Sequence, residues 1–169
     1  MTRRKARIAG AFYVLVFVTG GFALVGGKAG AAAGLIAGLL YIVVTVLFYG
    51  LFKAVNHRVS LIAAVVSLLG IAAGPLLKVN PLPLFGIYCL LIGYLIVRSV
   101  NVPRFLGFLM MFGGAGWLTF LSPSLASQLS PFNFAPGILG EGSLTLWLLV
   151  GRVDSHADSR ALPARSKPL

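Results

Sequence analysis

The sequence predicts an all-α membrane protein, a bundle of six transmembrane helices with the N-terminus and the C-terminus in the cytoplasm. Of its 169 residues, 59% are hydrophobic and only 10% are charged, and the mean hydropathy is +0.98. Soluble proteins carry about 25% charged residues, so this composition excludes an ordinary soluble domain. Six long apolar stretches predict the six spans, and basic residues concentrated on one side of them predict the orientation.

The apolar stretches have the length of membrane-crossing helices. They cover residues 8–26, 29–52, 59–77, 81–97, 105–121 and 132–150. A helix that crosses the hydrocarbon layer needs about 20 residues, with a range of about 17–25, so the fourth and fifth stretches are at the lower limit. Pro75 is expected to bend or end the third helix, and Pro136 to lie in the first turn of the last one. Helices are expected because backbone polar groups in lipid must be satisfied within the segment.

The domain organisation follows from the same pattern. Residues 1–153 are predicted to form one six-span membrane domain, and the polar residues 154–169 a disordered cytoplasmic tail. An alternative is that residues 3–31 form a secretory signal with a cleavage site at Ala29-Gly30-Ala31. Its apolar run exceeds the usual length of about 7–15 residues, so we expect the first helix to be retained.

Basic residues occupy alternate junctions between the stretches. Twelve of the fourteen Lys and Arg residues fall before the first stretch, after the second, after the fourth or after the last. The opposite side has only Lys28 and Lys78, and the loop 122–135 there is uncharged. The positive-inside rule therefore predicts a multi-pass membrane protein with both termini cytoplasmic. The net charge of +11 is interpreted as contact with anionic lipids, not with nucleic acid.

Gly30, Gly34 and Gly38 form a doubled small-xxx-small pattern on the second stretch. Glycine at every fourth position lets another helix approach closely. We interpret this face as helix packing within the bundle, with docking of a partner membrane helix or a second copy as the alternative. The face continues as Tyr41, Thr45 and Tyr49, whose polar groups suggest the bundle interior or, for Tyr49, the interfacial aromatic belt.

Glu141 is the only acidic residue inside any apolar stretch. A charge at the bilayer centre costs about 2.5–3.5 kcal/mol on insertion scales, so Glu141 needs a partner, water or a proton. Thr145 shares its helix face, and Tyr88 and Trp117 are expected to line an outward-facing pocket with it, while Lys78 reaches down by snorkelling. In this interpretation, Glu141 is the centre of a site that binds a ligand, an ion or a proton. The alternative is a hydrogen-bonded or protonated glutamate that joins helices.

Enzymatic chemistry has little support in these residues. The two histidines, His57 and His156, lie in a junction and in the tail, and Cys89 is the single cysteine. No disulfide within the chain, no metal site and no cofactor site is therefore predicted. We expect a non-enzymatic protein that binds or moves a small molecule or lipid near Glu141. A membrane scaffold that uses the Gly30, Gly34 and Gly38 face is the second hypothesis, and a membrane-embedded enzyme is the weakest.

Several motifs resemble a family of uncharacterised membrane proteins. These motifs are FGIYCLLIGYLIVRS at 85–99, VPRFLG at 102–107, GE followed by LTLWLLV at 140–150, ARIAG at 6–10 and LFKAVN at 51–56. Together they resemble the domain-of-unknown-function 4386 family. The resemblance implies a bacterial inner-membrane protein and no established activity.

The sequence departs from that family's pattern in two places. Family members tend to be longer, with extended segments after the first and third spans that are reduced here to 26–30 and 78–83. Many members have a histidine where this chain has Tyr88. This second departure weakens a metal or proton-relay interpretation of Glu141.

Overall fold

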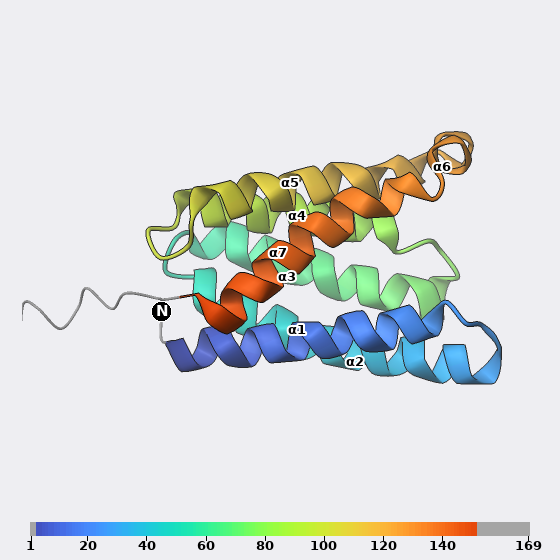
Figure 1. Ribbon diagram of the computed structural model, residues 1–169, viewed down its shortest axis with the longest axis horizontal. Helices are drawn as coiled ribbons and strands as arrows, with labels where there is room; N and C mark the ends of the chain where they lie inside the picture. Colours follow the sequence, from blue (N-terminus) through green and yellow to red (C-terminus); the bar gives the residue numbers. More distant parts are fainter. Residues whose placement is uncertain (1–2, 152–169) are drawn as a thin grey trace, which may run out of the picture.

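The computed structural model describes residues 3–151, all of whose regular structure is helical (Figure 1). The predicted tail 154–169 and His156 lie outside the described residues. The α-helices are α1 (Arg3–Ala23), α2 (Gly27–Phe52), α3 (His57–Ala72), α4 (Leu82–Arg98), α5 (Arg104–Leu118), α6 (Pro123–Leu129) and α7 (Ala135–Val150). A π-helical turn, Ala73–Leu77, extends α3, and the 3-10 turns Thr119–Leu121 and Phe132–Phe134 follow α5 and precede α7. The all-α prediction is confirmed for this part of the chain.

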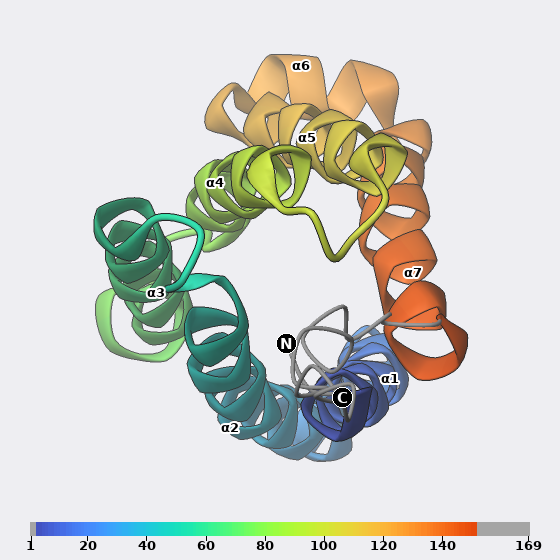
Figure 2. The same cartoon turned by 90° about the vertical axis from the view of Figure 1, so that its left-hand side faces the viewer.

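Six of these helices form a closed ring when the bundle is viewed end on (Figure 2). Each packs on the next in the order α1, α2, α3, α4, α5 and α7, and α7 packs back on α1. The N-terminus, the end of α7 and the α2–α3 and α4–α5 junctions lie at one end, here called the terminal end (Figure 1). The α1–α2 and α3–α4 junctions and α6 lie at the opposite end, the α6 end.

Four helical segments between residues 3 and 151 are long and apolar enough to cross a membrane. They are Arg3–Ala23, Gly27–Phe52, His57–Leu77 and Arg104–Leu121. Helix α4 is apolar but has 17 residues, and α7 has 16. Length and composition therefore indicate a membrane protein with four candidate spans, and the predicted count of six is not confirmed by this criterion.

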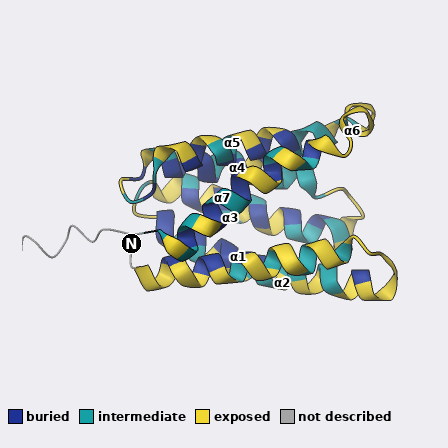
Figure 3. Cartoon of the chain, in the orientation of Figure 1, coloured by how far each residue is buried: buried dark blue, intermediate teal, exposed yellow. Residues whose placement is uncertain are grey.

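Exposed residues follow the outer side of the helices (Figure 3), and many of them are large and apolar, as a lipid-facing surface requires. Large side chains such as Leu39, Ile62, Phe108 and Leu146 are exposed on α2, α3, α5 and α7. In water such a surface would promote association, whereas in a bilayer it is matched by the acyl chains.

Several helices begin or end a few residues away from the predicted spans, each for a local reason. Helix α1 begins at Arg3 instead of residue 8, because the basic residues before the apolar run continue the helix. The third helix begins at His57, where the Asn56 side chain caps it by accepting a hydrogen bond from the Val59 amide at 3.1 Å. Pro75 lies within the π-helical turn, which ends at Lys78 in the left-handed conformation (φ 56°).

The uncharged loop 122–135 contains a helix that the sequence analysis did not predict. Ser122 caps α6 by accepting a hydrogen bond from the Leu125 amide at 3.4 Å, and Pro123 occupies the first turn. Helix α6 has seven residues, too few to cross a bilayer. It connects α5 to α7 at the α6 end of the bundle (Figure 1).

Glycines bring α4, α5 and α7 into backbone contact. A Cβ atom added to Gly93 of α4 would lie 2.7 Å from the carbonyl oxygen of Gly107 in α5. One added to Gly140 of α7 would lie 2.5 Å from the carbonyl oxygen of Leu109 in α5. Only a residue without a side chain fits at these crossings, which is the close approach that small residues permit between membrane helices.

Candidate functional site

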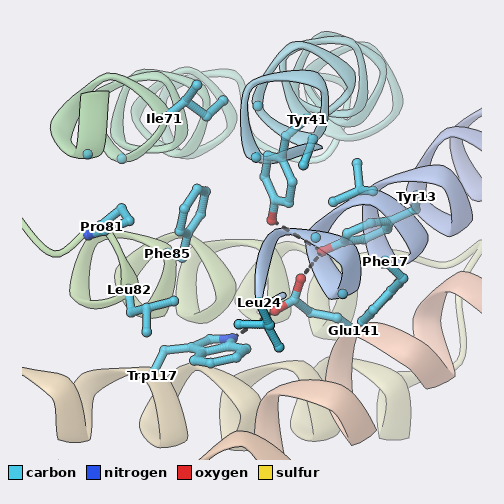
Figure 4. A pocket seen from close by; sticks show the side chains of 18 of the residues that line it. Tyr13, Phe17, Leu24, Tyr41, Ile71, Pro81, Leu82, Phe85, Trp117 and Glu141 are labelled. Atoms are coloured by element: carbon cyan, nitrogen blue, oxygen red, sulfur yellow. Dashed lines mark hydrogen bonds between the residues drawn. The ribbon is translucent and has the colours of Figure 1, made fainter. Parts of the chain in front are cut away.

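A cavity of ≈ 560 Å³ lies inside the ring, in the half of the bundle nearer the α6 end (Figure 4). Its volume falls within the range of about 300–1,000 Å³ that is usual for small-molecule sites. The walls are almost wholly apolar. They come from α1, α2, the end of α3, the start of α4, Trp117 of α5, and Phe134 and α7, so every helix of the ring contributes.

Glu141 lines this cavity from α7 and is the only acidic residue described by the structure. Its carboxylate accepts a hydrogen bond from the Tyr13 hydroxyl at 2.5 Å and one from the Trp117 indole N–H at 2.7 Å (Figure 4). The Cys89 thiol is a weaker donor, with its sulfur 3.8 Å from Oε1. Within residues 3–151, every group that bonds to this carboxylate is neutral.

The contact between Trp117 and Glu141 depends on a glycine one helical turn before the glutamate. Trp117 belongs to α5, and its ring lies against Gly137 of α7, where an added Cβ would overlap the indole. A residue with a side chain at 137 would displace the indole from this place. Gly137 therefore gives the indole N–H access to the carboxylate at 141.

Aromatic rings extend the polar contact toward α2 and α4. The Tyr13 and Tyr41 hydroxyls lie 3.3 Å apart, and because Tyr13 donates its proton to Glu141, Tyr41 is the donor of this hydrogen bond. Tyr41 also packs edge-on against Phe85, with ring centroids 5.0 Å apart, and against Tyr88 at 5.9 Å. The carboxylate thus lies at the edge of an aromatic cluster contributed by α1, α2, α4 and α5.

The structure brings some of the predicted pocket residues together and separates others. Glu141 and Trp117 are hydrogen bonded, and both line the cavity. Tyr88 is buried beside Tyr41, does not line the cavity, and its hydroxyl makes no hydrogen bond within the described residues. Thr145 donates a hydrogen bond to the backbone oxygen of Glu141 at 2.7 Å and does not line the cavity. Lys78 is exposed beyond the end of the π-helical turn and does not line the cavity.

The glycine pattern of α2 faces the interior of the ring. Gly30 lies against the backbone of α1, where an added Cβ would be 2.9 Å from the Ala23 carbonyl oxygen. Gly34 and Gly38 line the cavity, and Cβ atoms added there would meet only Ala23 and Ile71 at ordinary contact distances. This pattern is therefore used within the chain, and two of its three glycines create space.

The polar residues that follow these glycines also have partners inside the chain. Thr45 is buried, and its hydroxyl lies 2.7 Å from that of Ser67 on α3. The Tyr49 hydroxyl lies 3.1 Å from Nε2 of His57 near the terminal end. The face from Tyr41 to Tyr49 thus joins α2 to α1 and α3 through polar contacts.

Tyr13 is the main site residue that the sequence analysis missed. It is fully buried and donates the shortest hydrogen bond to Glu141. The available signal was its position. Tyr13 lies within the predicted span 8–26 and not at the span ends, and it is the span ends where interfacial tyrosines are enriched. Gly20 and Gly21, which open the α1 wall of the cavity, were also missed.

Comparison with known proteins identifies the C-terminal part of the chain. The family model described as Domain of unknown function (DUF4386) matches residues 77–151, which include α4, α5, α6 and α7. The motifs at 6–10 and 51–56 lie outside this match. Neither a curated protein nor a solved structure matches the chain. Residues 77–151, which contain Trp117 and Glu141, are similar to the DUF4386 family, and this match supports membership in that family.

Proposed function

We propose that this protein is a six-span membrane protein that binds a small apolar molecule or lipid in the cavity beside Glu141. In this proposal α4 and α7 cross the bilayer together with the four longer segments. The protein acts by binding or moving its ligand and not by catalysis. The single observation that carries the proposal is a cavity of ≈ 560 Å³ with one carboxylate in an otherwise apolar wall.

The arrangement of the ring supports the six-span topology. Helices α4 and α7 pack beside the longer helices and run between the same two ends of the bundle (Figures 1 and 2). Residues 132–150, formed by a 3-10 turn and α7, approach the length that a span needs. The basic residues at the terminal end favour a cytoplasmic location for that end. In the inner membrane they would contact anionic lipids there.

Labelling of single cysteines in intact cells tests this topology. In a Cys89→Ala background, Val79→Cys lies in the α3–α4 junction and Val100→Cys in the α4–α5 junction, and both positions are exposed. A membrane-impermeant maleimide is expected to label Val79→Cys from outside, and Val100→Cys only after the membrane is permeabilised. Labelling of both sites in intact cells, or of Val100→Cys alone, would contradict the proposed topology.

Glycine is the reason that the cavity exists on the α1, α2 and α3 side. Gly20 and Gly21 of α1 and Gly38 of α2 all line it. An added Cβ would meet nothing within 4 Å at Gly20 or Gly21, and only one side-chain atom at Gly38. Bundle interiors are normally packed to high density, so an open wall beside a carboxylate favours a bound molecule as its occupant.

The scaffold hypothesis has weaker support. A partner helix docked through Gly30, Gly34 and Gly38 would need these residues on the outside of the ring, whereas they face α1, α3 and the cavity. A homo-oligomer that uses another part of the apolar surface is compatible with the binding proposal. We therefore retain ligand binding as the proposed function.

Fluorescence of one tryptophan provides a direct test of binding. The chain has two tryptophans, and Trp117 lines the cavity whereas Trp147 does not. In Trp147→Phe protein, 1-bromonaphthalene, a neutral apolar quencher, is expected to quench Trp117 with a saturable component above its partition into the micelle. Gly38→Leu, which places a side chain in the cavity, should remove that component.

Matched variants separate occupancy of the cavity from general damage. Gly50→Leu is on the same helix, at a position with open space and outside the cavity lining, and should keep the saturable quenching. Gly20→Leu fills the cavity from the neighbouring helix α1 and should also remove the saturable quenching. Quenching that is unsaturable in the parent protein, or unchanged by both cavity-filling variants in folded protein, would refute ligand binding in this cavity.

A further inference from the structure

We propose that the ligand of this cavity is a hydrophobic organic monocation, with the Glu141 carboxylate as its counter-ion. This inference rests on the proposed function and specifies its ligand class. It follows from three features of the site: the charges that line it, the type of side chain in its walls, and the exposed apolar residues in its lining.

The charge of the lining is a single carboxylate. Among the residues that line the cavity, Glu141 is the only carboxylic acid, and none is Lys, Arg or His. Lys28 and Lys78 lie near the α6 end, but both are exposed and neither lines the cavity. An anionic ligand would therefore meet a like charge without a compensating cation, whereas a monocation would balance the one charge that the walls contain.

The carboxylate has capacity left for a ligand. An ionised carboxylate offers about four acceptor sites on its two oxygens. Oε2 accepts only from Tyr13, while Oε1 accepts from Trp117 and, weakly, from Cys89. Tyr13 and Trp117 themselves line the cavity, so the carboxylate faces the space that a ligand would occupy. Neutral donors orient the group without neutralising its charge.

The walls are rich in aromatic rings. Those that line the cavity are Tyr13, Phe17, Tyr41, Phe85, Trp117 and Phe134. Aromatic faces attract cations through their quadrupole and also pack against apolar substituents, so an aromatic enclosure with one carboxylate matches a cation that carries apolar groups. A strongly hydrated metal or ammonium ion would lose its water here without the polar ligands needed to replace it.

The lining of the cavity reaches the exposed apolar surface of the ring on the α1 and α7 side. These helices touch near the terminal end, where the Arg7 side chain bonds to the Leu149 oxygen at 3.1 Å, and they diverge toward the α6 end (Figures 1 and 2). In the divergent half, the cavity lining includes Leu24, which directly follows α1 and is 81% exposed, and Ile138 of α7, which is 56% exposed. A ligand that dissolves in the bilayer can therefore enter through the apolar side of the ring.

Two tetraphenyl ions of similar shape and opposite charge, together with a neutral triphenyl compound, test the ligand class. They are tetraphenylphosphonium, tetraphenylborate and the neutral triphenylphosphine oxide, titrated separately against Trp147→Phe protein with Trp117 fluorescence as the signal. Tetraphenylphosphonium is expected to bind at least about tenfold more tightly than either of the others. Glu141→Gln, which keeps shape but removes the charge, should lower its affinity to that of the neutral probe.

The 1-bromonaphthalene signal serves as the control and separates this inference from the proposed function. Glu141→Gln protein that still shows saturable quenching by 1-bromonaphthalene has an intact cavity, so a selective loss of tetraphenylphosphonium binding in it supports the inference. Equal affinity for the cation and the neutral probe, binding of the cation that is insensitive to Glu141→Gln, or preference for tetraphenylborate would overturn the inference and leave apolar binding in place. Absence of saturable binding for all probes, 1-bromonaphthalene included, would overturn both.

Discussion

Two walls of the ring use glycine in opposite ways. Between α4, α5 and α7, glycines bring backbones together, as at Gly93, where an added Cβ would lie 2.7 Å from the Gly107 oxygen. On the α1, α2 and α3 side, glycines line a cavity, as at Gly20, where an added Cβ would meet nothing within 4 Å. The same residue type makes one wall dense and leaves the other open. The difference shows that the spacing of glycines along a membrane helix does not by itself specify close packing.

The largest expected effect is a loss of stability when the backbone contacts of the dense wall are disrupted. Gly93→Ala places a methyl group against the backbone of α5 and the side chain of Met111, and a backbone oxygen cannot move away without shifting the helix. We expect a loss of about 3 kcal/mol in the free energy of unfolding, at the upper end of overpacking costs. Unfolding in mixed detergent micelles measures it.

The matched control for this prediction is Gly20→Ala in the open wall. The new methyl group has free space, and alanine favours the helix by about 0.5–1 kcal/mol over glycine. We therefore expect unchanged or increased stability. Equal losses at positions 20 and 93 would mean that the two walls do not differ in packing.

The sequence predicted the ring's components better than their contacts. Continuous apolar runs and the cost of unpaired backbone groups in lipid were enough to predict an all-α chain and the approximate position of each long helix. Which glycines would touch another backbone depended on helix rotation and crossing, which the spacing of Gly30, Gly34 and Gly38 did not determine. The same uncertainty hid Tyr13, because its partner Glu141 lies 128 residues later in the chain.

The second prediction concerns Gly137, at the boundary between the two walls. Because this residue has no side chain, it leaves space for the indole of Trp117. Gly137→Ala is expected to push the indole away from Glu141, with a cost of about 2 kcal/mol from overpacking and the lost hydrogen bond. In the Trp147→Phe background, the emission of Trp117 should shift as its N–H loses the carboxylate. Gly142→Ala is the control, because an added Cβ at this position of α7 meets nothing within 4 Å. An unchanged spectrum and stability in Gly137→Ala would show that Trp117 does not depend on this glycine.

The third prediction tests whether the hydrogen bond between Tyr13 and Glu141 stabilises the contact between the open wall and the dense wall. Tyr13→Phe removes the hydroxyl that joins α1 to Glu141 of α7, and leaves the carboxylate with one strong donor. Because the bonded group is a buried carboxylate, we expect a loss of about 1–2 kcal/mol, measured by the same unfolding experiment. Tyr94→Phe, on an exposed ring of α4, removes an equivalent hydroxyl and should change stability by less than about 0.5 kcal/mol. Similar effects of the two substitutions would mean that the Tyr13 bond contributes nothing specific.

The smallest expected effect lies within the open wall, where α2 and α3 meet through side-chain hydroxyls. Thr45→Val removes the group that lies 2.7 Å from the Ser67 hydroxyl while it keeps the volume of the side chain. Hydrogen bonds between membrane helices contribute about 0.6 kcal/mol on average, because the freed hydroxyl finds a backbone oxygen in its own helix.

Thr19→Val is the control, since the Thr19 hydroxyl bonds only within α1, to the Leu15 oxygen at 2.7 Å and the Val16 oxygen at 3.3 Å. A loss at position 45 as large as that of Gly93→Ala would mean that a single polar contact holds the open wall as firmly as backbone packing holds the dense one. A loss near 0.6 kcal/mol would leave α2 and α3 weakly joined, which is the mechanical condition for a wall that adapts to a ligand.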